Sequence, residues 1–251
     1  MFGMKYALLI HDDGPGGAEA SRAGAGALRE VLERLRADGS FRGARRLAPA
    51  SHTTTVRTRD GAPHVSRGPA ATTAKPLVGF VIVECDAEAR ATALASEVGR
   101  ATNAEVEVRP VAAPGSGGPQ RSGVSENSVV ARMKEFAFVI NVEDSKRPWP
   151  GEPAFDDLMD RCGRVLERLD EQSRFRGTER LAPAAEAKHL RIAAGGRATV
   201  VDGPFTEARE LIGGFILGEC ESVDEAILLA ALIPGAAVGS VEVREAWGIF
   251  D

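Results

Sequence analysis

The sequence lacks the features of several large classes of protein. It contains three cysteines, Cys85, Cys162 and Cys220, which form no CxxC pair and are odd in number, so we expect a reducing compartment and no disulfide scaffold. No apolar run approaches the ~20 residues that a membrane span requires. A net charge of −5 provides no excess of positive charge to follow a nucleic-acid backbone. We therefore predict neither a membrane nor a nucleic-acid partner.

The N-terminal segment lacks the parts of a signal peptide. Its short apolar run follows a single lysine and ends at His11, Asp12 and Asp13, with neither a long apolar core nor a cleavage site of small residues. This pattern favours the first strand of a cytoplasmic protein.

Common catalytic and nucleotide-binding motifs are also missing. The glycine-rich stretch after the first strand fits neither GxGxxG nor GxxxxGK[ST], and Asp12 and Asp13 would repel a phosphate there. No GxSxG elbow or Cys-His motif marks a nucleophile. His11, His52 and His64 could meet at one end of the first sheet, but their spacing matches no zinc motif. We expect no metal site and no cofactor.

What the sequence does contain is an internal repeat. Residues 31–50 and 165–184 match at 13 of 20 positions without a gap. After a shift of one residue the alignment resumes, and it equates Gly68-Pro69 with Gly203-Pro204, Phe80 with Phe215, Glu84-Cys85 with Glu219-Cys220, and the VEVR segments at 106–109 and 241–244. The chain is therefore predicted to hold two copies of one domain.

The copies occupy residues 1–111 and 129–251. Residues 112–128 between them are rich in Gly, Ser and Pro, which is the composition of a linker. A flexible linker of this length spans roughly 20–25 Å, enough for two small domains to pack on each other.

Both copies show the same order of predicted elements. Apolar runs at 5–11 and 135–141 predict buried strands. An amphipathic helix follows in each copy, with apolar stripes at Leu28, Val31, Leu32 and Leu35, ending before Gly39, and at Leu158, Cys162, Val165, Leu166 and Leu169.

The second part of each copy begins with a predicted hairpin that turns at Asp60-Gly61 or at Gly195-Gly196. A strand, a helix and the VEVR strand then close the unit; the second copy's helix opens with a capping box at Ser222 and Glu225. This is the split βαβ order of a ferredoxin-like α+β domain with an added hairpin. Such a domain leaves one sheet face without helices, and the duplicate is the most economical surface to bury it on.

Several segments together resemble the YCII-related family, in particular its DGPF branch. They are MKYALLI, TTTVR, DGPFTEARELIGGF, DEAILLAALIP and VEVR, and they cover both halves. The resemblance implies a ferredoxin-like fold that pairs into a dimeric α+β barrel, here within one chain. It also implies suspected small-molecule enzymes, one of them similar to a dehydrochlorinase, and genes that often neighbour extracytoplasmic-function sigma factors.

The sequence departs from this family at two places. The classical branch implies a histidine in the first helix that works with an aspartate, and neither first helix here contains a histidine. Only the second copy keeps the DGPF motif; in the first copy Arg67 replaces Asp202, Ala70 replaces Phe205, Thr72 replaces Glu207 and Pro76 replaces Leu211.

Charged and aromatic residues kept only in the second copy are the candidate ligand-binding residues. They are Asp202, Phe205, Glu207 and Arg209, together with His189, that copy's only histidine. Each also has a structural explanation: a turn-forming Asp, a core Phe, a solvated charge run and a hydrogen-bonded His. Catalytic residues are not identified.

Two functions therefore stay open. In the first, the two repeats form an intramolecular pseudo-dimer that binds an unidentified small molecule near the DGPF motif of the second repeat, with or without enzyme activity. In the second, the protein is a non-catalytic accessory or regulatory protein linked to an extracytoplasmic-function sigma factor. A further homodimer is compatible with both.

Overall fold

The first half contains the predicted helices and strands and one strand that was not predicted, Phe41–Leu47, between the first helix and the hairpin. The computed structural model describes residues 3–11, 25–70, 75–112, 123–124, 133–143, 145–193, 195–204 and 210–249. Its elements in the first half are β1 (Met4–His11), α2 (Ala25–Ala37), β2 (Phe41–Leu47), β3 (Thr54–Arg59), β4 (Ala62–Arg67), β5 (Leu77–Cys85), α3 (Glu88–Thr102) and β6 (Glu105–Pro110).

The second half repeats this order. Its elements are β8 (Lys134–Val142), α4 (Pro153–Glu171), β9 (Phe175–Arg180), β10 (Lys188–Ile192), β11 (Ala198–Asp202), β12 (Leu211–Cys220), α5 (Val223–Leu232), α6 (Gly235–Val238) and β13 (Gly239–Trp247). Short 3₁₀ turns at Ala50–His52 and Ala184–Glu186 precede the hairpins at equivalent positions.

Local chemistry fixes the ends of these elements as predicted. Gly39 follows α2 with a φ of 76°, a left-handed conformation that glycine adopts without strain. Asp60 and Gly61 both have positive φ, as a two-residue hairpin turn requires. At the start of α5, the Glu225 N–H donates to Ser222 Oγ at 3.2 Å.

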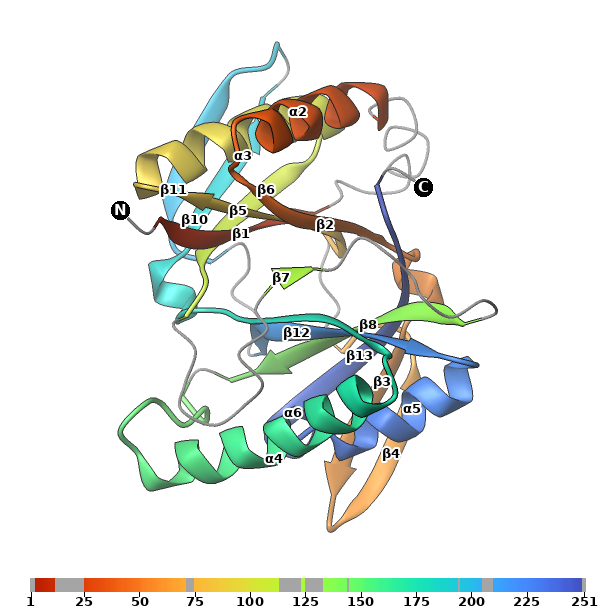
Figure 1. Cartoon of the computed structure of the whole chain (residues 1–251). Coiled ribbons are helices and arrows are strands. Elements are labelled where there is room, and N and C mark those ends of the chain that lie inside the picture. Colours follow the sequence, from red (N-terminus) through yellow and green to blue (C-terminus); the bar gives the residue numbers. More distant parts are fainter. Residues whose placement is uncertain are drawn as a thin grey trace.

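The fold is α+β with antiparallel strands. In the first half the order across the sheet is β6-β1-β5-β2, and in the second half it is β13-β8-β12-β9. Helices α2 and α3 cover the outer face of one set of strands, and α4, α5 and α6 cover the outer face of the other, so the strands lie between two helical layers (Figure 1). Each half has its own apolar cluster between helices and strands, with Cys85 in one and Cys220 in the other.

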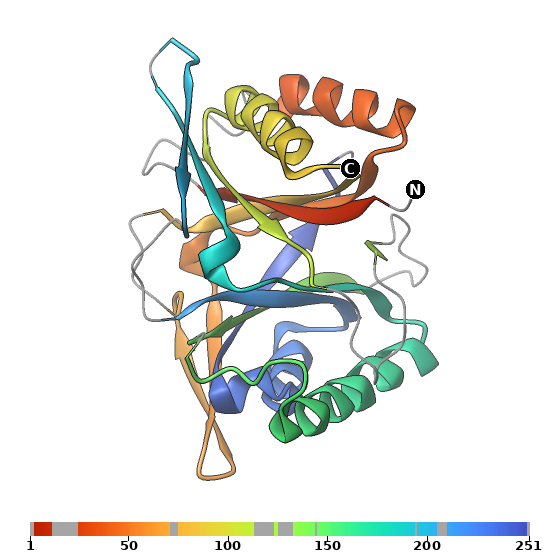
Figure 2. The same ribbon diagram turned by 90° about the vertical axis from the view of Figure 1, so that its left-hand side faces the viewer.

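The hairpins are exchanged between the halves. Strand β3 of the first half pairs with β13 of the second, with Val56 opposite Val241. Strand β10 of the second half pairs with β6 of the first, with Leu190 opposite Val106. The hairpins β3–β4 and β10–β11 thus cross in opposite directions to extend the other half's sheet (Figure 2).

The sheet faces without helices meet each other. A third apolar cluster fills the space between them, with members from both halves: Ala7, Leu9, Leu47, Leu77, Phe80, Ile82, Ala137, Val139, Leu181, Phe215, Leu217 and Ala246. The rings of Phe80 and Phe215 stack with centroids 4.2 Å apart. These two phenylalanines are the equivalent residues that the alignment of the repeats pairs.

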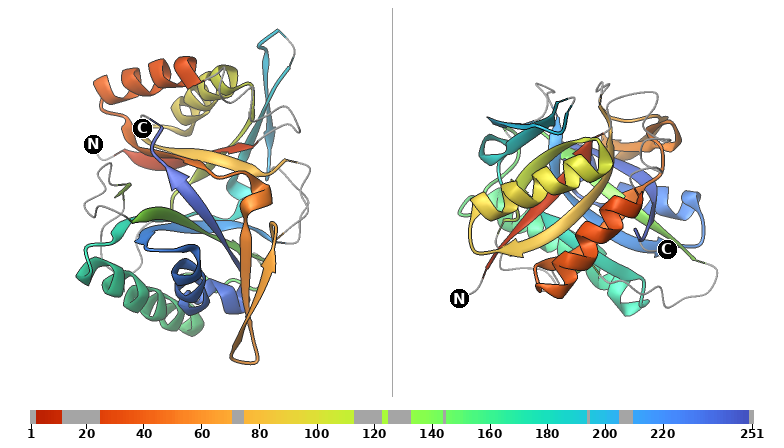
Figure 3. Two further views of the ribbon diagram at one scale, coloured as in Figure 1. Left: turned by 90° about the vertical axis from the view of Figure 1, so that its right-hand side faces the viewer. Right: turned by 90° about the horizontal axis from the view of Figure 1, so that it is seen from above.

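The halves are also joined along their edges. On one side Leu47 of β2 pairs with Ala246 of β13, and on the other side Val111 forms a bridge with Leu181. The left view of Figure 3 shows the two sets of strands lying against each other with helices outside.

One short element lies in the predicted linker. Residues 123–124 form β7, which pairs with Thr178 and Gly177 of β9; the rest of the predicted linker beyond Ala112 lies outside the described residues. In the described part of the chain, no helix combines the length and the apolar composition needed to cross a bilayer.

Truncation of a stacked ring should destabilise the whole protein. We predict that Phe215→Ala lowers the free energy of unfolding by ~3–5 kcal/mol, because it removes a buried aromatic ring and leaves a cavity. The control is Leu228→Ala on α5, where the side chain is 69% exposed and the loss should stay within ~0.5 kcal/mol. Urea unfolding measures both, and a loss below ~1 kcal/mol for Phe215→Ala would contradict the prediction.

Candidate functional site

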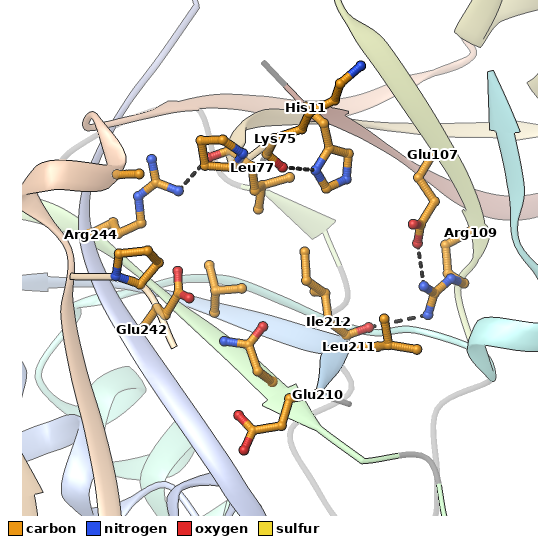
Figure 4. A pocket seen from close by; sticks show the side chains of 15 residues that line it. His11, Lys75, Leu77, Glu107, Arg109, Glu210, Leu211, Ile212, Glu242 and Arg244 are labelled. Atoms are coloured by element: carbon orange, nitrogen blue, oxygen red, sulfur yellow. Dashed lines mark hydrogen bonds and ion pairs between the residues drawn. The ribbon is translucent and has the colours of Figure 1, made fainter. Parts of the chain in front are cut away.

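A small pocket lies between the facing sheets (Figure 4). Its volume of about 60 Å³ corresponds to roughly four to six water molecules at ~10–15 Å³ each. Both halves supply its lining, which consists of His11, Ala50, Pro69, Lys75, Pro76, Leu77, Glu107, Arg109, Val139, Asn141, Glu210, Leu211, Ile212, Glu242 and Arg244. The last residue before β12 and the first two residues of that strand bring the segment after the DGPF motif to this pocket.

Most of the lining consists of equivalent residues from the two repeats. The strand registers show the equivalence, because His11 lies opposite Leu77 as Asn141 lies opposite Ile212, each after an irregularity in the pairing. The equivalent pairs are His11 with Asn141, Lys75 with Glu210, Pro76 with Leu211, Leu77 with Ile212, Glu107 with Glu242, and Arg109 with Arg244. The pocket is therefore symmetric in position, and its polar residues differ between the halves at His11 and Lys75.

The two arginines hold the halves together. Arg109, of the first half, donates to the carbonyls of Ala182 and Ile212 in the second, both at 3.2 Å. Arg244, of the second half, donates to the carbonyls of Ala48 and Leu77 in the first. Both guanidinium groups are almost fully buried, and burial lowers the pKa of Arg244 to about 10. Arg244 therefore remains cationic at neutral pH.

The equivalent glutamates have different partners. Glu107 forms an ion pair with Arg109 in its own strand. Glu242 accepts a hydrogen bond from the Ala70 N–H at 2.8 Å. Burial raises the pKa of Glu242, and the hydrogen bond from Ala70 and the charge of Arg244 oppose this rise. Glu242 is thus the carboxylate of the pocket that protonates more readily than an exposed glutamate.

His11 is a buried histidine at the end of β1. Its Nδ1 lies 3.3 Å from the carbonyl oxygen of Lys75. Because a carbonyl only accepts, Nδ1 carries the proton, and the lone pair is on Nε2. Burial lowers the pKa of His11, while the charge of Glu107 opposes this shift. His11 is therefore neutral at pH 7 and can accept a proton or a hydrogen bond.

A second cluster flanks the pocket beside Lys75. The ammonium group of Lys75 donates to Glu105 Oε1 at 2.5 Å, and His189 Nε2 lies 2.8 Å from Glu105 Oε2. Burial lowers the pKa of His189, and the hydrogen bond to Glu105 opposes this shift. The exchanged hairpin of the second half is thus anchored to β6 of the first through a buried polar contact.

The equivalent position in the other half is arranged differently. Glu210 accepts two hydrogen bonds from Arg57 of the first half's hairpin, at 2.6 and 3.0 Å, and one from Ser240 at 2.9 Å. Carboxylates of the opposite half therefore help to fix each hairpin, Glu210 for the first half's hairpin and Glu105 for the second half's.

The candidates from the DGPF comparison do not gather at one point. Asp202 ends β11 with its side chain 86% exposed and forms an ion pair with Lys188 at 2.8 Å. His189 is buried in the neighbouring strand, against Glu105. Neither His189 nor Asp202 is among the residues that line the pocket. Phe205, Glu207 and Arg209 lie outside the described residues. Whether these five residues bind a ligand remains a prediction.

The three histidines considered for a metal site also lie apart. His52 and His64 are exposed, whereas His11 is buried against the pocket. Among the described residues, no three His, Cys, Asp or Glu side chains lie close enough together to hold a metal ion.

Sequence reasoning missed the charged residues of the VEVR strands. Glu107, Arg109, Glu242 and Arg244 belong to strands that are otherwise apolar and buried. Charged side chains rarely lie in such strands without a partner. The sequence did contain a signal for these residues: both copies have two charged residues at alternate positions of an otherwise apolar strand.

Comparison with known proteins identifies the repeat. A model of the YCII-related domain matches residues 4–113 and again 137–249. An uncharacterized protein of Rhizobium meliloti (strain 1021) is 39% identical over 82 residues, which are 32% of this chain. The chain spans 65% of the length of this curated relative.

Two solved structures are similar over nearly the whole chain at low identity. A heme-binding protein from Thermus thermophilus is 11% identical with a TM-score of 0.43, covering 100% of this chain and 93% of that chain. A mutant chlorite dismutase from Candidatus Nitrospira defluvii is 8% identical with a TM-score of 0.44, covering 99% of this chain and 93% of that chain.

The lowered pKa of His11 makes a pH-dependent contribution to stability. The folded state resists protonation of His11, so this contribution is present above the unfolded pKa near 6.5 and is lost as the pH falls towards the lower folded pKa. We predict that between pH 7.5 and 5.5 the wild type loses more stability than His11→Asn, by up to ~1.4 kcal/mol per pH unit.

Asparagine is chosen for this substitution because Asn141 occupies the equivalent position. Urea unfolding across the pH range gives the difference, and His64→Asn on the exposed strand β4 is the control. Parallel pH profiles for the wild type and His11→Asn would contradict the prediction.

Proposed function

The chain belongs to the YCII-related domain family and carries the domain twice, and on this premise we propose that the repeats form an intramolecular pseudo-dimer that binds a small uncharged polar molecule. The pseudo-dimer is a dimeric α+β barrel of two ferredoxin-like domains within one chain. The binding site is the pocket between the sheets, next to the segment that follows the DGPF motif of the second repeat.

The pairing of strands supports the barrel. The four central strands of each half have equivalent orders, and the hairpins are exchanged. Leu47 meets Ala246 on one side, and Leu181 meets Val111 on the other. These two contacts join equivalent positions, as a two-fold relation between the repeats requires.

The observation that carries the binding proposal is a buried neutral histidine at the wall of a pocket formed by both repeats. The other repeat has an asparagine at the same position, so packing alone does not demand an imidazole there. The tautomer of His11 leaves a hydrogen-bond acceptor at Nε2. A ligand with an O–H or N–H group matches this acceptor.

The charges of the lining favour an uncharged ligand. Glu107 is paired with Arg109, Glu210 with Arg57, and Lys75 with Glu105. Arg244 faces Glu242, whose pKa is raised by burial. These pairings leave the described lining with no charge for a buried ionic ligand to compensate, and transfer of an uncompensated charge from water is costly.

Proton transfer is the chemistry that this pocket could perform. His11 can accept a proton from an acidic C–H, O–H or N–H group, and Glu242 can exchange a proton because burial raises its pKa. Both residues belong to the lining of one pocket. A proton that His11 Nε2 takes from one position of a ligand would have to return to another position of the same ligand, so the reaction class that fits is a proton shift within the bound molecule.

The size of the pocket limits the affinity. At most ~1.5 kcal/mol is gained per non-hydrogen atom, so a ligand of about five such atoms binds with micromolar affinity at best. Binding is best measured by ligand-observed NMR at millimolar concentrations.

We predict that small uncharged amides, lactams and enols give saturation-transfer signals with the wild type. The signals should weaken about tenfold or more in His11→Asn, because one hydrogen bond at a buried site is lost. Glu242→Gln tests the second polar group of the pocket. No binding by any such compound, or equal binding by wild type and both variants, would contradict the proposed site.

Asp202→Ala serves as the second arm of this experiment. Its carboxylate is exposed and paired with Lys188, away from the lining. Loss of binding in Asp202→Ala with binding kept in His11→Asn would move the site to the DGPF turn itself.

The second candidate is a non-catalytic accessory role. It is favoured by the engagement of both buried arginines with carbonyls of the opposite half, which gives the VEVR residues a role in assembly. In that case His11→Asn would alter the pH dependence of stability and no ligand would be found.

A further inference from the structure

Two part-buried ion pairs join strands of the two sheets and cross between the halves. Lys5 of β1 in the first half donates to Glu179 Oε1 of β9 in the second at 3.4 Å. Arg45 of β2 in the first half makes a two-point contact with Glu135 of β8 in the second, with Nε–Oε1 at 2.5 Å and Nη2–Oε2 at 3.1 Å. The side chains of Arg45 and Glu179 are at most 5% exposed.

The two pairs occupy equivalent positions. Lys5 and Glu135 are equivalent residues of the two repeats, and so are Arg45 and Glu179, because the members of each couple lie opposite equivalent residues in the neighbouring strand. The register partners are Lys5 with Glu84, Glu135 with Glu219, Arg45 with Phe80 and Glu179 with Phe215. In a two-fold homodimer the same residue would occupy both equivalent positions, so each half would supply one cation and one anion to the two pairs. Here the charges at equivalent positions are inverted: the first half supplies both cations and the second half supplies both anions.

Ion pairs inside each half show no inversion. Arg42 pairs with Glu84 at 2.8 Å in the first half, and Arg176 pairs with Glu219 at 2.7 Å in the second. These residues are equivalent, and the arginine is on β2 or on its equivalent β9 in both cases. The inversion is therefore found in the two pairs that cross between the facing strands, Lys5–Glu179 and Arg45–Glu135.

The hairpin contacts carry charge in both directions. Lys188 and Arg191 of the second half's hairpin contact Glu88 and Glu105 of the first half, at 3.3 and 3.8 Å. Arg57 of the first half's hairpin contacts Glu210 of the second half at 2.6 Å. The first half has Lys75 at the position equivalent to Glu210. Arg191, the residue equivalent to Arg57, shares Glu105 with Lys75, so in a pairing of two first halves Arg57 would have a carboxylate partner. The inversion is therefore confined to Lys5–Glu179 and Arg45–Glu135.

We propose that these crossing charges make each half select the other and reject its own kind. This rests on the pseudo-dimer of the proposed function. Two first halves would bring Lys5 against Arg45 twice, and two second halves would bring Glu135 against Glu179 twice. Like charges across a desolvated interface are strongly unfavourable, whereas the unlike assembly has two attractive pairs.

The partner that fits this surface is therefore the other half and not a copy of the same half. Duplication alone leaves two identical self-complementary surfaces, which would also allow like halves of separate chains to associate. The inverted charges remove that alternative while the apolar cluster, shared by both kinds of pairing, stays in place.

The test uses a variant that keeps every attractive contact of the native pairing. In the double variant Lys5→Glu with Glu179→Lys, each half holds one cation and one anion. The pairing of a first half with a second half keeps two attractive ion pairs. The pairing of two first halves, or of two second halves, gains two attractive ion pairs in place of two repulsive contacts. The matched control is Arg42→Glu with Glu84→Arg, an inversion of a pair inside the first half.

A chain with a specific protease site inserted between residues 113 and 122 is purified, cut after folding, unfolded in urea and refolded with both halves present. Native mass spectrometry then identifies the pairs. We expect unlike pairs to exceed like pairs by about tenfold or more for the wild type and for the control, and like pairs to reach the frequency of random pairing in Lys5→Glu with Glu179→Lys. Random pairing in the wild type would overturn the proposal, as would equal selectivity in all three proteins.

The intact chain provides the deciding measurement if the cut halves do not reassemble. After refolding at high concentration, sedimentation should show more dimer for Lys5→Glu with Glu179→Lys than for the wild type, because like halves of two chains can then pair. Equal dimer fractions would overturn the proposal. Ligand binding measured on the same monomers separates this outcome from a failure of the proposed pocket, since none of these residues lines it.

Discussion

The contact between the two helix-free sheet faces is the constraint on which the rest of the structure depends. Each half covers one face of its strands with helices and leaves the other to be buried. Phe80 and Phe215 stack at the centre of that contact, and Arg109 and Arg244 bridge its polar end. The pocket exists because the apolar cluster gives way there to charged residues of the VEVR strands.

Duplication within one chain explains why the interface is equivalent in position and different in chemistry. A homodimer must place the same residue at both equivalent positions. Here His11 corresponds to Asn141, Lys75 corresponds to Glu210, and the crossing ion pairs are inverted in charge. One repeat can thus supply the polar group of a pocket while the other supplies packing.

The sequence predicted the helices and most strands, missed β2 and β9, and did not predict which strands pair across the halves. Periodicity placed α2 and the hairpin turn at Asp60-Gly61, because stripe and turn chemistry are local. It could not show that β3 pairs with β13, because a strand pattern does not specify which distant edge it meets. His11 and Glu242 were missed as a site for the same reason: the face they share is defined by the other repeat. Asp202 was singled out by its motif, and its exposure could not be inferred from a turn residue.

Hydrogen exchange in increasing urea tests most directly whether the halves share one core. Amides of β5 and β12 lie in different repeats and carry the stacked Phe80 and Phe215. If the facing sheets hold the protein together, both strands should open with the same free energy and the same dependence on urea, as parts of one cooperative unit. Exchange of one strand at a distinctly lower free energy, while the other stays protected, would show two independent domains and contradict the account.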